Sequence, residues 1–136
     1  EKGVQRADPV SEYINIHTAP NDYVLVWGGQ TGINFLSKRD AQTPYSLYPF
    51  LAPSPLTDRI SAEYYLSLQQ QPPLLIIDGS VFDPEKVISL DEKNPLHWIS
   101  KHGAYTNPYL SDILNFIHQN YSLKEVINNV PIYQHK

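Results

Sequence analysis

Two short runs of apolar residues predict buried strands. Residues 23–27 read YVLVW and residues 74–78 read LLIID, so neither run alternates with polar positions. An unbroken apolar run of this length is typical of a strand that is covered on both faces of its sheet. Residues 43–50 (TPYSLYPF) carry aromatic rings between prolines, and they predict a further short strand.

Other segments have apolar residues at helical spacing, and they predict helices over residues 9–18, 31–38, 57–70 and 110–121. The last segment has the clearest pattern, with apolar residues at positions i, i+3, i+4, i+7 and i+11. Asp8-Pro9 and Asn107-Pro108 each suit an N-cap followed by a proline at the first helical position. The polar and proline-rich stretches between these segments are expected to be turns and loops.

The end of the chain predicts a β-hairpin. Residues 122–127 and 130–134 are strand-like, and Asn128-Asn129 separates them. Asparagine tolerates a positive φ angle, so this pair suits a two-residue hairpin turn. Residues 79–106 show no clear period and predict a long irregular segment. The core residues expected within it are Phe82, Ile88, Trp98 and Ile99.

Strands that alternate with helices predict an α/β fold, and 136 residues suit one compact domain. We expect residues 1–136 to form a three-layer sandwich around a mainly parallel, Rossmann-like sheet, with the C-terminal antiparallel β-hairpin at its edge. The residues expected to be buried are Val24, Val26, Leu75, Ile77, Leu110, Ile113, Leu114 and Ile117.

The glycines that follow the first strand resemble the start of a phosphate-binding loop. A dinucleotide fingerprint has the form G-x-G-x-x-G and an acidic residue at the end of the next strand. Gly29 and Gly32 fit the last two glycine positions, but Trp27 stands at the first, and no acid ends the strand at 43–50. No Gly-Lys-Ser/Thr follows either, so both nucleotide motifs are incomplete.

Ligands of open α/β sheets nevertheless bind at the carboxyl ends of strands. Asp78 also ends a strand, where a carboxylate could hold a metal or sugar hydroxyls, or could close an Asx-type turn. The histidines lack metal-ligand spacing, and we expect no metal, no cofactor and no catalytic residue in this chain. The candidate ligand-binding residues are Trp27, Gly28, Gly29, Gln30, Thr31, Asp78 and Ser80.

Composition narrows the class of protein. The net charge is -4 and there is no basic run, which disfavours nucleic acid as a partner. Cysteine is absent, so the chain has no disulfide and no thiol nucleophile. No apolar run approaches the roughly 20 residues of a membrane-spanning helix. Methionine is absent as well and Glu1 comes first, so we expect a fragment of a larger protein.

The stretch APNDYVLVWGGQTGINFLSKRDAQTPYSLYPFL, residues 19–51, resembles a known family. It is similar to the soluble C-terminal region of bacterial multi-pass membrane proteins of the dolichyl-phosphate-mannose-protein mannosyltransferase-like family (glycosyltransferase family 39). The later phrases PPLLIIDGS and YSLKEVINNVPIYQ extend the resemblance, which covers most of residues 8–134. It is a pattern of element order and short phrases, without a single diagnostic motif.

The resemblance implies a location and a role. It implies a domain on the extracytoplasmic face of the bacterial membrane, whose partners are the membrane helices of the same polypeptide and a polyprenyl-phosphate sugar or a glycan acceptor. The family's catalytic acid lies in an early loop between membrane helices, so the expected role here is a non-catalytic accessory domain that helps to position acceptor or lipid-linked donor. Two alternatives stay open: a free-standing nucleotide or sugar-nucleotide binding protein, and a structural interaction module.

Overall fold

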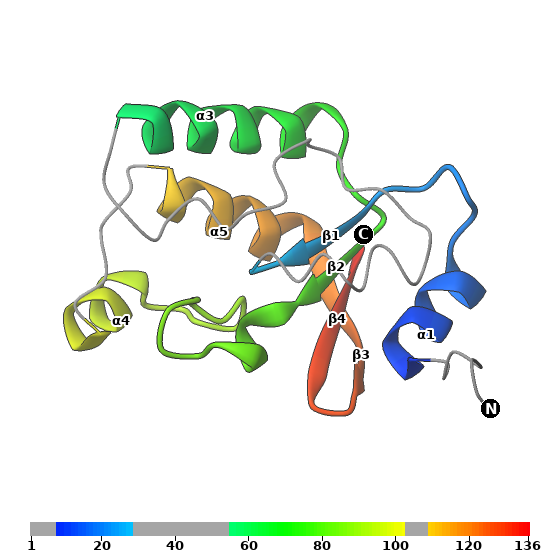
Figure 1. Ribbon diagram of the computed structural model, residues 1–136. Coiled ribbons are helices and arrows are strands. Elements are labelled where there is room, and N and C mark those ends of the chain that lie inside the picture. Colours follow the sequence, from blue (N-terminus) through cyan, green and yellow to red (C-terminus); the bar gives the residue numbers. More distant parts are fainter. Residues whose placement is uncertain (1–7, 29–54, 103–108) are drawn as a thin grey trace.

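The computed structural model describes residues 8–28, 55–102 and 109–136 (Figure 1). Its elements are α1 (Pro9–His17), β1 (Val24–Trp27), α3 (Pro55–Gln70), β2 (Leu75–Asp78), η1 (Gly79–Phe82), α4 (Pro95–His102), α5 (Leu110–Asn120), β3 (Tyr121–Ile127) and β4 (Val130–His135). The α/β class is therefore confirmed. The helix predicted at 31–38 and the strand predicted at 43–50 lie outside the described residues.

The sheet is mixed, so the prediction of a mainly parallel sheet was wrong. The described strands are ordered β1-β2-β4-β3, and β1 pairs with β2 in parallel, whereas β4 is antiparallel to both β2 and β3. The hairpin extends the sheet beyond β2 as an antiparallel edge, as predicted, with β4 next to β2 and β3 outermost among the described strands. The reason lies in packing, because Ile132 of β4 pairs with Ile77 of β2 and both side chains are fully buried.

The hairpin turn itself follows the prediction. Asn128 and Asn129 have φ angles of 51° and 68°, both positive. Two consecutive positive φ angles define the turn that matches the twist of a two-residue hairpin, and asparagine adopts them at little cost. Local turn chemistry therefore sets the pairing of β3 with β4, whereas burial sets where the pair joins the sheet.

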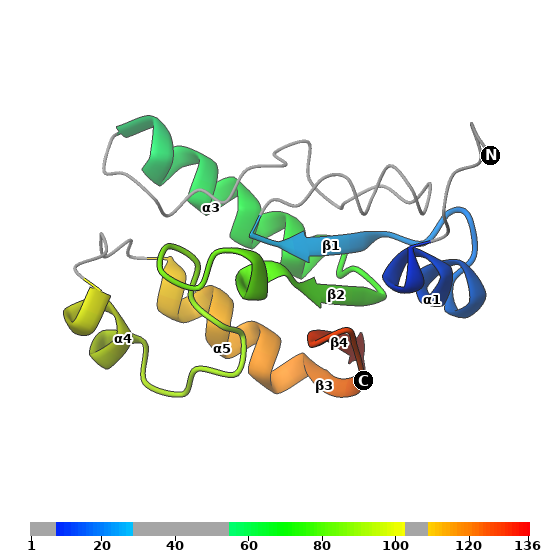
Figure 2. The ribbon, with the colours of Figure 1, turned by 60° about the horizontal axis from the view of Figure 1, so that its bottom comes forward.

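Side chains alternate along β1 and β2 and build two separate cores. Val24 and Val26 pack with α1 on one face of the sheet. Leu25 and Trp27 pack with α3 and α5 on the other face. Figures 1 and 2 show α3 and α5 close to each other and α1 apart from them. All eight residues expected to be buried are buried, which confirms that prediction.

The predicted cap of α1 is confirmed, because the Asp8 carboxylate accepts a hydrogen bond from the Ser11 amide at 2.9 Å. The predicted irregular segment, in contrast, contains a helix, α4. The Asn94 side chain accepts from the His97 amide at 3.2 Å, and Pro95 is the first helical residue. This is the same cap-and-proline signal as at Asp8, so Asn94-Pro95 in the sequence indicates the start of α4.

The core residues predicted within 79–106 differ in burial. Ile88 and Trp98 are buried as expected. Phe82 is 51% exposed, so its predicted burial was wrong. Phe82 ends η1 on the surface, where hydrophobicity alone does not decide which way a side chain faces. The Ile99 side chain lies outside the described residues.

Two isoleucines give a matched test of the core. Ile77→Ala should lower the free energy of unfolding by about 2–5 kcal/mol, because Ile77 is fully buried beneath α1 and the change leaves a cavity. Ile16→Ala should cost less than about 0.5 kcal/mol, because Ile16 is 77% exposed on α1. Urea denaturation measures both, and equal losses for the two variants would contradict the assigned core.

Candidate functional site

The carboxyl ends of β1 and β2 bring together part of the predicted ligand site. The strands are parallel and adjacent, and Trp27 pairs directly with Asp78 in the register. Gly28 follows Trp27, and Ser80 lies in η1 directly after Asp78. Gly29, Gln30 and Thr31 lie outside the described residues. The four described residues are therefore neighbours, as the strand-end argument predicted.

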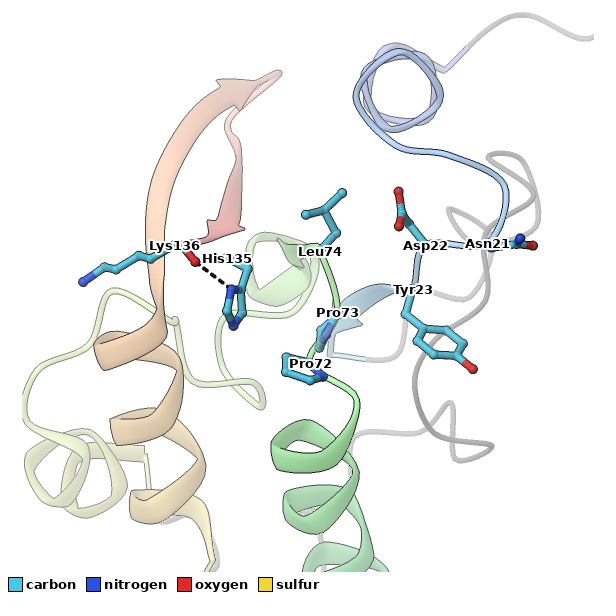
Figure 3. A pocket seen from close by; sticks show the side chains of 8 residues that line it. All are labelled: Asn21, Asp22, Tyr23, Pro72, Pro73, Leu74, His135 and Lys136. Atoms are coloured by element: carbon cyan, nitrogen blue, oxygen red, sulfur yellow. Dashed lines mark hydrogen bonds between the residues drawn. The ribbon is translucent and has the colours of Figure 1, made fainter.

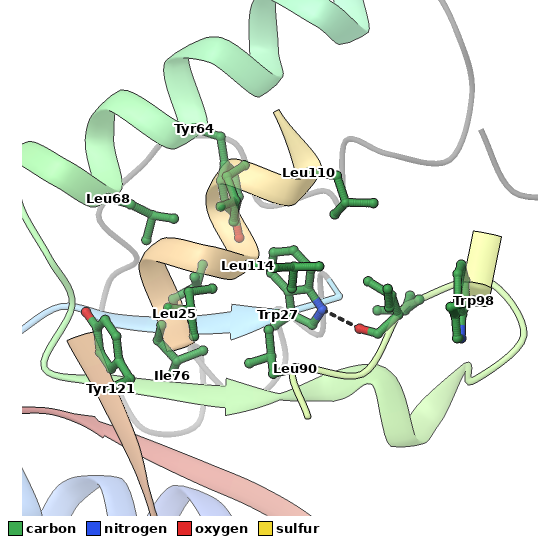
Figure 4. Packing of buried hydrophobic residues seen from close by; sticks show 14 residues of the cluster. Leu25, Trp27, Tyr64, Leu68, Ile76, Leu90, Trp98, Leu110, Leu114 and Tyr121 are labelled. Carbon is green, nitrogen blue, oxygen red and sulfur yellow. Dashed lines mark hydrogen bonds between the residues drawn. The ribbon is translucent and has the colours of Figure 1, made fainter. Parts of the chain in front are cut away.

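Trp27 is built into the core at this edge (Figure 4). Its side chain has no exposed surface, and its indole Nε1 donates a hydrogen bond to the Ile88 carbonyl at 2.8 Å. The edge of its ring meets Tyr64 of α3, with the ring centroids 6.3 Å apart. A buried tryptophan needs a partner for its N–H, and here a distant backbone carbonyl serves. Trp27 thus joins β1 to the segment that follows η1.

Asp78 uses both carboxylate oxygens inside the protein. Its Oδ1 accepts from the Ser80 amide at 3.0 Å, which opens η1 as an Asx-type turn. Its Oδ2 accepts from the Leu90 amide at 3.1 Å and from the Ser89 hydroxyl at 3.4 Å. The side chain is only 1% exposed, and a buried carboxylate is tolerated when hydrogen bonds replace its water. Asp78 therefore organises the loop after β2.

Residues 83–90, which we name the strap, are held from a third element as well. His118 of α5 places Nε2 2.6 Å from the Leu90 carbonyl. In this contact Nε2 carries the proton and donates, since the carbonyl only accepts. The strap is thus fixed by side chains from β1, β2 and α5. Sequence reasoning missed His118 because the pair lies 28 residues apart and has no local signature.

Gly28 lets the strap approach β1 closely. Its φ angle is +102°, and a Cβ built at this position would lie 3.3 Å from Cγ1 of Val87. Glycine is the residue that adopts such an angle without strain and leaves this space free. In the structure, therefore, Gly28 has the role of a turn and close-packing residue.

Two carboxylates that flank the strap in the sequence affect the titration of a neighbouring tyrosine. Burial raises the pKa of Tyr133 to about 12, and the negative charges of Asp78 and Asp91 add to the shift. The Tyr133 hydroxyl is consequently protonated throughout the physiological range. Within residues 8–28, 55–102 and 109–136 there is no group of His, Cys, Asp and Glu side chains that could hold a metal ion.

A cavity of about 380 Å³ lies at the opposite end of β1 and β2 (Figure 3). It is lined by the residues just before these two strands and by the end of β4. Backbone hydrogen bonds tie the three segments together: the Leu74 amide donates to the Tyr23 carbonyl at 2.9 Å, and the His135 amide donates to the Leu74 carbonyl at 3.0 Å. Its lining consists of Asn21, Asp22, Tyr23, Pro72, Pro73, Leu74, His135 and Lys136.

Comparison with known proteins finds no matching family model, no matching curated protein and no matching solved structure. Among the described helices, none has the length and apolar character needed to cross a membrane.

The anchoring role of Asp78 predicts a large loss of stability on a small chemical change. Asp78→Asn replaces one acceptor oxygen by an NH2 group. This group cannot accept the hydrogen bond that the backbone N–H of Leu90 or Ser80 donates to the carboxylate. We expect the free energy of unfolding to fall by about 1–3 kcal/mol, because a buried donor loses its acceptor. Asp91→Asn, an exposed neighbour, serves as the control and should change stability little. Equal denaturation midpoints for the two variants would contradict the anchoring role of Asp78.

Gly28→Ala provides an independent test of the close approach between β1 and the strap. The new methyl group meets Val87, and the positive φ angle is strained for alanine, so a loss of about 1–3 kcal/mol is expected. Calorimetry at neutral pH measures this loss as a lower Tm. A Tm equal to that of the unchanged chain would show that the strap does not pack against this position in solution.

Proposed function

We propose that this chain is a non-catalytic, extracytoplasmic accessory domain of a bacterial membrane glycosyltransferase that uses a polyprenyl-phosphate sugar. The non-catalytic part of the proposal rests on what the polar side chains at the carboxyl ends of β1 and β2 bind. The polar groups of Trp27 and Asp78, which would face a ligand in an open α/β sheet, bind the strap instead. A domain built in this way offers a shaped surface rather than a reactive centre.

The assignment to a glycosyltransferase is supported by the family resemblance of the sequence. Three of the phrases that carry it fall on described strands: VLVWG spans β1 and Gly28, PPLLIIDGS spans β2 and the start of η1, and YSLKEVINNVPIYQ spans β3 and β4. The remainder of the stretch at 19–51, from residue 29 on, lies outside the described residues. The phrases therefore belong to the framework of the domain. This is what a shared fold requires, because framework strands tolerate less change than loops.

The finer architecture is part of the same proposal. We propose that the complete chain forms a three-layer sandwich, with α1 covering one face of the sheet and α3 and α5 covering the other. The two separate core clusters support it, because each face of β1 and β2 has its own helical partner. A sheet covered on both faces also accounts for the unbroken apolar sequence of both strands.

The proposed partners are the membrane helices of the same polypeptide, on the extracytoplasmic side of the bacterial membrane. There the domain would help to position the glycan acceptor or the lipid-linked donor. Catalysis would belong to the membrane helices, as the resemblance implies.

Two alternative functions have specific requirements. A free-standing nucleotide or sugar-nucleotide binding protein would use the turn at Gly28, where backbone can approach a phosphate. That role needs the strap to leave the strand ends, against the hydrogen bonds of Asp78 and Trp27. A structural interaction module needs no ligand at either end of the sheet. Coding sequence upstream of Glu1 distinguishes the first alternative, which needs no membrane helices there. The accessory domain needs them, and a structural interaction module would show the same gene arrangement.

Deletion of the domain tests the proposal. In the full polypeptide that contains this chain, removing residues 8–136 should lower sugar transfer from a labelled polyprenyl-phosphate sugar, while the membrane helices remain inserted and folded. The 136-residue chain alone should transfer no sugar. Transfer by the isolated chain that disappears in Asp78→Asn, but not in Asp91→Asn, would overturn the accessory role and make this chain an enzyme. Unchanged transfer after the deletion would favour the structural interaction module.

A further inference from the structure

The cavity at the amino ends of β1 and β2 has the size and framework of a small-molecule site. Its volume of about 380 Å³ falls within the roughly 300–1,000 Å³ that ligand pockets occupy. It lies at the amino ends of β1 and β2 (Figure 3). The strap packs against the carboxyl ends of the same two strands. The cavity is therefore a better candidate for a ligand than the edge that fold analogy favours.

One buried residue holds two parts of the cavity wall in place. The Tyr121 hydroxyl donates a hydrogen bond to the Pro73 carbonyl. The edge of the same ring meets His135, with the ring centroids 5.1 Å apart. Burial raises the pKa of Tyr121, so its hydroxyl keeps the proton that this bond requires. The positions of Pro73 and His135 are thus set before any ligand arrives, which lowers the entropic cost of binding.

The cavity wall combines apolar surface with polar groups that can form further hydrogen bonds. Pro72 and Pro73 supply the apolar part, whereas the Tyr23 ring points away from them (Figure 3). Oδ2 of Asp22 accepts a hydrogen bond from the Ala19 amide at 2.7 Å. Nδ1 of His135 forms a hydrogen bond with the Lys136 carbonyl at 2.9 Å. Within the part of the chain that the structure describes, Oδ1 of Asp22 and Nε2 of His135 make no other hydrogen bond.

Charge narrows the class of ligand. Among the lining side chains Asp22 brings a negative charge and Lys136 a positive one, so these side chains have no strong joint preference for an anion or a cation. A purely apolar ligand would leave the Asp22 and His135 groups without partners, which is costly. A sugar ring carries an apolar C–H face and a rim of hydroxyl groups that both donate and accept. It can therefore contact the proline surface and form hydrogen bonds with the polar groups at the same time.

We propose that this cavity binds one sugar unit of a glycan. Its apolar wall, Pro72 with Pro73, would contact the face of the sugar ring, and Asp22 with His135 would bind hydroxyl groups. For its biological role the inference rests on the proposed function, and it deepens that function by naming where the glycan docks. The binding event itself can be measured on the 136-residue chain without any membrane partner.

The test is an NMR titration of the ¹⁵N-labelled chain with methyl α-mannoside and, separately, methyl β-glucoside. At least one should give saturable shifts at the amides of Asn21, Asp22, Tyr23, Leu74 and His135, with a Kd on the order of 1–10 mM for a single sugar. Inorganic phosphate serves as the anionic probe and should not give this pattern.

Matched variants decide whether the shifts report this cavity. His135→Ala should weaken binding about tenfold or more, because a hydrogen bond that fixes the ligand is lost. His97→Ala, which removes an exposed histidine from α4, should leave the Kd unchanged. The amide spectrum shows in each case that the variant is folded, and Asp22→Ala provides a second variant with an effect of the same direction.

Several results would overturn the inference. These are no saturable shift with either glycoside at 100-fold the expected Kd, shifts centred on Gly28 and Ser80 instead, or a Kd that His135→Ala does not change. Shifts with phosphate but not with the glycosides would make this an anion site. The proposed function fails by a different result, unchanged sugar transfer after deletion of the domain, so the two failures are distinguishable.

Discussion

The buried carboxylate of Asp78 is the interaction on which the arrangement of this end of the protein depends. It ends β2, starts η1 and holds the strap through the Leu90 amide. A carboxylate with 1% exposure would be very unfavourable without these donors, and the donors in turn would lack acceptors without it. Trp27 and His118 add bonds to the same strap from β1 and α5. Strand ends, helix and loop therefore form one cooperative unit.

This unit has a consequence for function. In many open α/β sheets the loops at the strand carboxyl ends form a crevice for a ligand. Here Val87, Ile88 and Leu90 of the strap are buried against that edge, so the crevice is replaced by core. The open cavity lies at the other end, where the turn before β1, the prolines before β2 and the end of β4 meet. The location of a ligand site thus depends on where the loops pack.

Part of the fold could be predicted because its causes are local. The cap of α1, the helix at α5 and the Asn128-Asn129 turn each depend on residues within a few positions of one another. Helix α4 could have been found in the same way, from Asn94-Pro95. The neighbourhood of Trp27 and Asp78 was also predictable, because parallel strands end at the same edge. What their side chains do there was not.

The sequence by itself determined the α/β class, the buried strands and the hairpin, because periodicity, caps and turn residues act over short distances. Only the tertiary structure decided that β4 and not β3 pairs with β2, that the strap fills one end of the sheet and that a cavity opens at the other. These features rest on contacts such as Trp27 with Ile88, 61 residues apart in the chain. The partners in such contacts are chosen by burial and by the pairing of buried polar groups, which no local pattern records.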